Sequence, residues 1–106
     1  MGLKDYFENT EGLGVLATAD ADGKVNLAIY ARPHVMEDGS LAFIMTDRLT
    51  HKNIQSNPYA TYLFKENGSG YKGKRIYLQN SRRREFPINQ LSQSAPLSFR
   101  HRQQRI

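Results

Sequence analysis

The sequence predicts a mainly β fold, a small antiparallel β-barrel with an N-terminal helix and one further helix between the third and fourth strands. Two features of the chain carry this prediction. Five short runs of apolar, β-branched and aromatic residues are separated by turns that combine Gly with Asp or Asn. One polar segment of helical length interrupts the series between the third and fourth runs. At 106 residues the chain has room for a single domain.

The first element is a short helix. Leu3, Tyr6 and Phe7 recur at helical spacing, and the helix is expected to end at Gly12. Pro33 predicts an edge position or a bulge in the second strand, because its nitrogen cannot donate to a ladder. Strands are expected over residues 13–18, 24–35, 41–46, 60–66 and 71–79.

The polar helical segment, residues 49–57, has a definite start and end. Thr50 is a good N-cap residue, and Pro58 cannot be accommodated within a helix. His51 and Lys52 then fall in the first turn, where the helix dipole disfavours cations by roughly a few tenths of a kcal/mol. A bound anion would reverse that cost, so the segment predicts an anion site suited to phosphate. A capped surface helix with a solvated basic face is the alternative.

Composition argues against several classes of protein. There is no Cys, which excludes disulfides and Cys-ligated metals, and His34, His51 and His101 show no metal-ligand spacing. No apolar run approaches the roughly 20 residues of a membrane span. The first residues lack the apolar region of a signal peptide. We therefore expect a cytoplasmic protein that binds no metal and no membrane.

The net charge of +5 lies at the C-terminal end. Residues 1–78 carry nine Lys and Arg against nine Asp and Glu, whereas residues 79–106 carry six Arg against one Glu. From residue 80 the sequence has no Gly, no two-residue alternation and no helical stripe. We predict a barrel domain over residues 1–79 and a weakly ordered basic tail over residues 80–106. Nucleic acid is not favoured as a partner, because aromatic residues do not alternate with these arginines.

Residues 13–78 resemble the pyridoxamine 5'-phosphate oxidase-like family of FMN-binding split barrels. The segment LATADADGKVNLAIYARP, residues 16–33, is similar to the family's first hairpin. A strand ending in Thr46 follows, then the basic turn THKN at residues 50–53, and then SNP leading into the strand ATYLF. The resemblance implies a homodimeric split barrel with FMN at the subunit interface.

The resemblance also implies where FMN lies. The turn from Thr46 through Asn53 would hold the phosphate, and the isoalloxazine ring would lie along the second strand, contacted mainly by backbone. Tyr71, Lys72 and Tyr77 are candidates for the partner's contribution. The implied cofactor-binding residues are Asn26, Leu27, Ala28, Ile29, Tyr30, Ala31, Met45, Thr46, Asp47, Thr50, His51, Lys52 and Asn53.

The expected function is that of an FMN-binding flavoprotein, an oxidoreductase that exchanges two electrons with a small substrate. The sequence names no catalytic acid or base. Two alternatives stay open: a non-catalytic FMN-binding or electron-transfer module, and a nucleic-acid-binding barrel acting through its Arg-rich tail. Arg32 and His34 are either a polar wall near the flavin or surface residues. The aromatic residues of the later strands either stack on a ring or fill the core.

Overall fold

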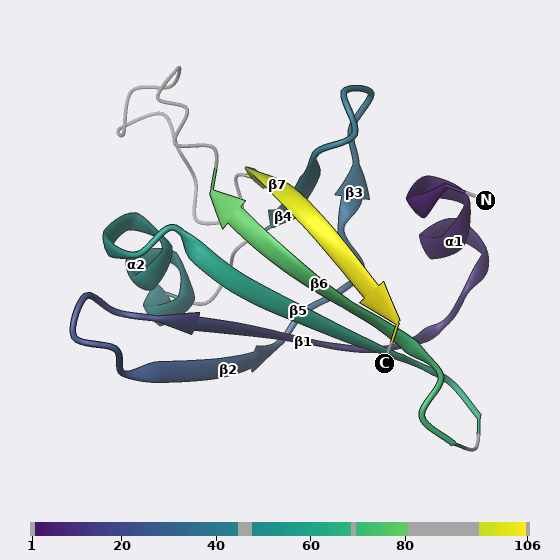
Figure 1. The fold of residues 1–106 in the computed structure, drawn as a ribbon, viewed down its shortest axis with the longest axis horizontal. Helices are drawn as coiled ribbons and strands as arrows, with labels where there is room; N and C mark the ends of the chain where they lie inside the picture. Colours follow the sequence, from purple (N-terminus) through teal and green to yellow (C-terminus); the bar gives the residue numbers. More distant parts are fainter. Residues whose placement is uncertain (1, 45–47, 69, 81–95, 106) are drawn as a thin grey trace.

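The computed structural model describes residues 2–44, 48–68, 70–80 and 96–105. These residues form two helices and one seven-stranded antiparallel sheet with the strand order β2-β1-β5-β6-β7-β4-β3 (Figure 1). The predicted mainly β class is therefore confirmed. The elements are α1 (Leu3–Asn9), β1 (Gly12–Ala19), β2 (Val25–Ile29), β3 (His34–Val35), β4 (Leu41–Ile44), α2 (Arg48–Ser56), β5 (Tyr59–Glu66), β6 (Gly73–Asn80) and β7 (Pro96–Arg105).

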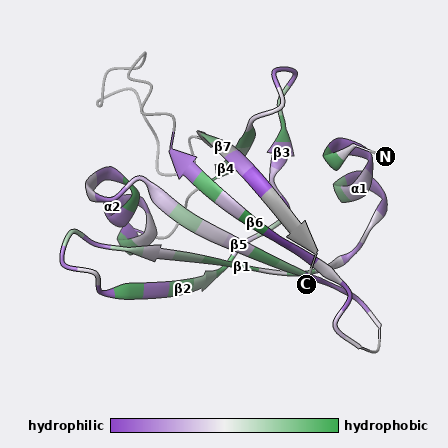
Figure 2. Ribbon diagram, in the orientation of Figure 1, coloured by the Kyte–Doolittle hydropathy of each residue, from purple (hydrophilic) through white to green (hydrophobic). Residues whose placement is uncertain are grey.

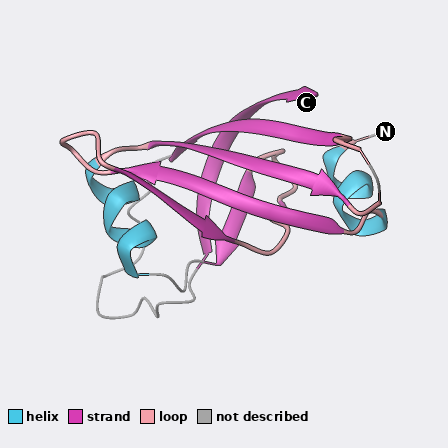
Figure 3. Ribbon diagram, turned by 90° about the horizontal axis from the view of Figure 1, so that it is seen from below, coloured by secondary structure: helices cyan, strands magenta, loops and turns pink. Residues whose placement is uncertain are grey.

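The sheet curls because its two edge strands are close together in the chain. β2 and β3 stand at opposite ends of the strand order, yet only residues 30–33 separate them. A chain advances at most about 3.5 Å per residue, so the end of β2 lies within roughly 18 Å of the start of β3. Edges this near require the sheet to bend back on itself, as Figure 1 and Figure 3 show. The result is a small barrel in which β2 and β3 do not pair with each other.

The core lies inside the barrel and is dominated by aromatic side chains. Phe43, Phe64 and Phe99 are each 1% exposed or less, and the rings of Phe43 and Phe99 meet edge to face with centroids 5.6 Å apart. The two helices lie at opposite ends of the barrel (Figure 3). The ring centroids of Phe7 in α1 and Phe64 are 5.3 Å apart, and Ile54 of α2 belongs to the same core.

Tyr62 fixes the crossover between β2 and β3 from inside the barrel. Its hydroxyl lies 3.2 Å from the carbonyl oxygen of Tyr30 and 3.3 Å from that of Ala31, so it donates to this pair. Gly14 leaves the space for this arrangement, because a Cβ at that position would overlap the Tyr62 hydroxyl. One side chain of β5 therefore holds the segment that joins the two edges of the sheet.

Several boundaries differ from the sequence prediction. The N-terminal helix ends at Asn9 rather than Gly12, because Gly12 begins β1 and pairs with Glu66. The expected strand 24–35 is divided into β2 and β3, since residues 30–33 cross from one sheet edge to the other. Pro33 lies in that crossover, where no ladder bond is needed.

The predicted tail is also corrected. β6 continues to Asn80, and residues 96–105 form β7, which pairs with β6 on one side and β4 on the other. Phe99 is fully buried and lies opposite Leu41 in register. The physical reason is that β4 and β6 each present an open edge whose backbone groups one more strand satisfies. Residues 96–105 therefore belong to the barrel, and the domain does not end at residue 79.

Candidate functional site

The segment predicted to hold a phosphate is anchored by buried polar side chains. Thr50 and Asn53 of α2 are 0% and 2% exposed. The Asn53 Nδ2 donates to the Thr18 Oγ1 at 3.1 Å, and the Asn26 Nδ2 donates to the Thr50 Oγ1 at 3.3 Å. Buried polar groups are costly unless they are paired, so these bonds fix α2 against β1 and β2. They also join Asn26 and Thr50, which were predicted for the two different halves of the cofactor site.

The first turn of α2 is basic. The helix begins at Arg48, so Thr50 is its third residue and the prediction of Thr50 as the N-cap is wrong. Within this turn Arg48 is exposed and His51 is half-buried, and the exposed Lys52 follows as the fifth residue of the helix. The described helix has no acidic residue in its first turn. The positive end of the helix dipole and the basic side chains therefore both favour an anion here.

The remaining predicted residues are spread over the molecule. Met45, Thr46 and Asp47 lie outside the described residues. Tyr71 and Lys72 are exposed in the turn between β5 and β6, and Tyr77 is half-buried on β6.

β2 offers an open backbone edge. Among the described strands it pairs with β1 alone. The Tyr30 N–H donates to the Gly14 carbonyl at 3.0 Å, and these two residues stand opposite each other when the register is continued by one residue. The even-numbered residues of β2 are therefore the ones that bond to β1. Bonded and non-bonded positions alternate in an antiparallel pair. The N–H and C=O groups of Val25, Leu27 and Ile29 therefore point away from β1, toward the open edge.

The same strand carries an exposed apolar surface. Val25, Leu27 and Ile29 are 71%, 66% and 72% exposed, and Figure 2 shows the hydrophobic positions of β2. The register places Val15 of β1 beside Ile29 and places Leu63 of β5 beside Val15. We call these five residues the apolar outer face. Large aliphatic side chains gathered in this way commonly mark an interaction surface.

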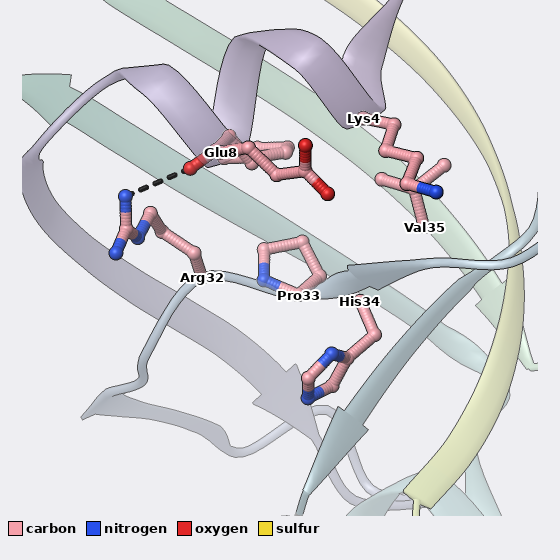
Figure 4. A pocket seen from close by; sticks show the side chains of 7 residues that line it. Lys4, Glu8, Arg32, Pro33, His34 and Val35 are labelled. Atoms are coloured by element: carbon pink, nitrogen blue, oxygen red, sulfur yellow. Dashed lines mark hydrogen bonds between the residues drawn. The ribbon is translucent and has the colours of Figure 1, made fainter.

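A polar cleft lies between α1 and the crossover (Figure 4). The Arg32 Nη1 donates to the carbonyl oxygens of Phe7 at 2.7 Å and Thr10 at 2.8 Å, so its charge satisfies the C-terminal end of α1. This contact assigns Arg32 to the helix end rather than to a wall beside a cofactor. The cleft, of about 410 Å³, is lined by Lys4, Phe7, Glu8, Arg32, Pro33, His34 and Val35.

Solved structures share this architecture. The chain is similar to an FMN-binding protein from Syntrophomonas wolfei subsp. wolfei, with a TM-score of 0.72 and 14% identity over 97% of this chain and 82% of that one. The fold is a split β-barrel. A tagged single-residue variant of HupZ from Group A Streptococcus gives a TM-score of 0.71 and 19% identity over 98% of this chain and 96% of that one. Tagged HupZ gives 0.67 and 20% identity, over 93% and 85%.

No protein-family model matches the chain, and no curated protein matches it in sequence. In the described part of the chain, no helix is long and apolar enough to cross a membrane. The same residues contain no group of three or more His, Asp or Glu side chains placed to hold a metal ion.

Proposed function

We propose that this chain is an FMN-binding flavoprotein, an oxidoreductase of the pyridoxamine-phosphate-oxidase-like class that works as a homodimer. The observation that carries the proposal is the bond between Asn26 and Thr50 at 3.3 Å. It joins the strand with an open backbone edge to the helix with a basic first turn. A ligand with a flat polar ring and an anionic end can use both features at once, and FMN is such a ligand. A solved FMN-binding protein of the same fold supports this choice.

The phosphate would bind at the first turn of α2. The first N–H groups of a helix have no partners within the helix and are available to an anion. Arg48 and Lys52 are exposed beside them, and both carry a positive charge at neutral pH. Thr50 and Asn53 would act indirectly, because their buried side chains hold the helix in place.

The ring would lie along the open edge of β2. The N–H and C=O groups of Val25, Leu27 and Ile29, which pair with no described strand, alternate along that edge. They complement the alternating acceptors and donors on the polar edge of a flavin. Bound FMN would supply the two-electron chemistry. The chain would orient the ring through the strand backbone and fix the phosphate through α2.

A second copy of the chain would cover the apolar outer face. A domain of this size buries only about 60–65% of its unfolded surface, so further apolar burial contributes stability that the monomer lacks. The face and the open edge belong to the same strand, β2. A partner on the face would therefore also stand beside the ring, which supports an FMN site at the subunit interface.

The visible absorbance spectrum of the purified protein, followed by titration with FMN, tests the proposal. We expect a flavin spectrum, or saturable quenching of added FMN fluorescence, that is lost on denaturation. Riboflavin, which lacks the phosphate, should bind more weakly because it cannot use the first turn of α2. Colourless protein that takes up no added FMN would refute the proposal.

The composition of residues 26–31, the segment proposed to contact the flavin ring, favours a second candidate. That candidate is an electron-transfer or carrier module without a substrate reaction. Residues 26–31 bring one ionisable side chain, that of Tyr30, and it is 7% exposed. Steady-state turnover with a reductant and small acceptors separates the two functions. An enzyme turns over repeatedly with at least one small acceptor, whereas a module exchanges electrons with a protein partner only.

A further inference from the structure

We propose that the outer face of β5, β6 and β7 carries a second binding site, for a nucleoside monophosphate, a ligand that joins a single base to an anionic group. The site is a cleft of about 490 Å³, a volume within the range of small-molecule pockets. It uses strands other than β2 and residues other than those of α2, and it assigns Tyr77 to this cleft rather than to the partner's contribution to the flavin site. Its lining consists of Tyr59, Tyr77, Leu78, Gln79, His101 and Arg102.

The register explains why these residues form a cleft. Tyr59 stands opposite Gln79, and Tyr77 stands opposite Arg102 in the next row. Alternate residues of a strand face opposite sides of the sheet. Leu78, which lies between the two rows, is 3% exposed and faces the core. The walls are therefore outward-facing side chains, and the backbone between the rows forms the floor.

Arg102 supplies the positive charge. Its guanidinium lies 4.5 Å over the centroid of the Tyr77 ring, which restrains an otherwise flexible side chain. Stacking of this kind leaves the in-plane N–H groups available to an anion. Within the described ranges, the guanidinium has no ion pair or hydrogen bond, and no Asp or Glu lines the cleft.

Tyr59 supplies the aromatic surface on the other side. It is 63% exposed, although its backbone is fixed. The Tyr59 N–H donates to the Asn57 Oδ1 at 3.2 Å, and the Asn80 N–H donates to the Pro58 carbonyl at 2.7 Å. A large ring held in water on an anchored backbone is suited to stacking against a base. Tyr59 and Arg102 together match the two halves of a nucleotide.

β7 creates this site. In the linear sequence the arginines after residue 80 have no alternating aromatic neighbours. Pairing with β6 brings Arg102 onto Tyr77, which lies 25 positions earlier in the chain. The sheet therefore combines a cation and aromatic rings that the sequence keeps apart.

Calorimetric titration of the full chain with AMP tests the proposal. Tyr59→Ala and Arg102→Gln should each weaken AMP binding by roughly fivefold to a hundredfold, the usual effect of losing one stacked ring or one charged contact. Tyr71→Ala and Lys72→Gln are the matched controls, because both residues are exposed in the turn between β5 and β6. Both controls should bind AMP like the unmodified chain, and all four variants should keep its circular dichroism spectrum. Equal losses in test and control variants, or no AMP binding by the unmodified chain, would overturn the proposal.

Three further ligands complete the test. Adenosine and inorganic phosphate should each bind more weakly than AMP, and phosphate that binds as tightly as AMP would overturn the aromatic part of the proposal. A single-stranded oligoadenylate that binds far more tightly than AMP, with a steep salt dependence, would assign the cleft to nucleic acid and overturn the assignment to a free nucleotide.

FMN distinguishes this site from the flavin site. Saturating FMN should leave AMP binding unchanged, and Arg102→Gln should leave FMN binding unchanged. Displacement of AMP by FMN, together with loss of FMN binding in Arg102→Gln, would make the cleft part of the flavin site and end the claim of a second one. A chain that binds AMP in the expected pattern but no FMN would support the cleft and refute the flavin proposal.

Discussion

The side-chain amide of Asn53 donates a hydrogen bond to the hydroxyl of Thr18 at 3.1 Å, and both residues are 2% exposed. A second bond, from Asn26 to Thr50, lies beside it. Ile54 is the one apolar residue that α2 buries among its described side chains. The position of the helix against β1 and β2 therefore depends strongly on polar contacts. One buried and one partly buried hydrogen bond decide where the basic first turn is presented.

Asn53→Leu should lower the free energy of unfolding by about 1–3 kcal/mol, because it leaves the buried Thr18 hydroxyl without its donor. Urea denaturation measures the change. Adding Thr18→Val should recover most of the loss, since both polar groups are then removed together. Gln55→Ala, on the exposed side of the same helix, should stay within about 0.5 kcal/mol of the unmodified chain. A double variant no more stable than Asn53→Leu would show that the bond is not the cause.

Gly14→Ala should destabilise the barrel by about 1–3 kcal/mol, the usual cost of overpacking a core. The added methyl group would overlap the hydroxyl and the Cζ of Tyr62, which is 0% exposed and bonded to the crossover. Thermal denaturation followed by circular dichroism gives the measurement. Gly2→Ala is the control, because a Cβ there meets no atom within 4 Å. Equal melting temperatures for the two variants would contradict the close approach of Gly14 to Tyr62.

Local patterns were sufficient to predict much of the barrel. In β5, Ala60, Tyr62 and Phe64 are buried while their neighbours are more exposed, which is the two-residue period that predicts a strand. Gly23 and Gly39 have positive φ angles of 86° and 88°, as expected of the two Asp-Gly turns. These features depend on residues that are close in sequence, so the chain alone reveals them.

The features missed by the sequence prediction depend on long-range pairing. β7 forms because β4 and β6 both have backbone groups that pair with a further strand. Nothing in the sequence pattern of residues 96–105 predicts this pairing. β2 alternates large aliphatic residues with Asn26 and Ala28, yet the large aliphatic side chains face outward and Asn26 faces α2. Alternation predicts two faces but not which one is covered. Thr50 was a reasonable cap by residue type, but the packing of α2 made it a buried hydrogen-bond acceptor.

Stability should fall in alkali because of two tyrosines. Burial raises the pKa of Tyr62 above its usual 10.0, and burial, the hydrogen bond to Glu66 and the charge of Glu66 raise the pKa of Tyr6. Above pH 10 the unfolded chain loses these protons while the folded chain keeps them. The unfolded state then binds fewer protons, so the free energy of unfolding decreases as pH rises.

Urea denaturation between about pH 9 and pH 11 measures this decrease. Tyr62→Phe should reduce the slope of the free energy of unfolding against pH by up to about 1.4 kcal/mol per pH unit above 10. Phe has no phenol proton for the unfolded chain to lose. Tyr71→Phe is the control, since that side chain is 84% exposed. Identical slopes for Tyr62→Phe and the unmodified chain would rule out the contribution of Tyr62.

Leu27→Asp should convert the proposed dimer to a monomer. Leu27 is 66% exposed and central to the apolar outer face, and a charge there would be buried without a partner in the dimer. Light scattering on a sizing column should give twice the chain mass of 12.1 kDa for the unmodified protein and the single mass for Leu27→Asp. Met36→Asp changes a residue that is 47% exposed outside that face, and it should remain dimeric. An unmodified chain that is monomeric at every concentration would remove the dimer from the proposal.

Lys52→Ala should weaken FMN binding by about 1–3 kcal/mol, the usual contribution of a hydrogen bond to a charged group. Quenching of FMN fluorescence measures the affinity. The same titration with riboflavin separates the contribution of the phosphate to binding from that of the ring. Lys52 would act on the phosphate alone, so riboflavin affinity should not change. Lys4→Ala, which removes an exposed Lys from α1 at the other end of the barrel, should bind FMN normally. Equal losses for FMN and riboflavin would mean that Lys52 acts through the ring or through the fold, and the first turn of α2 would then lose its assignment to the phosphate.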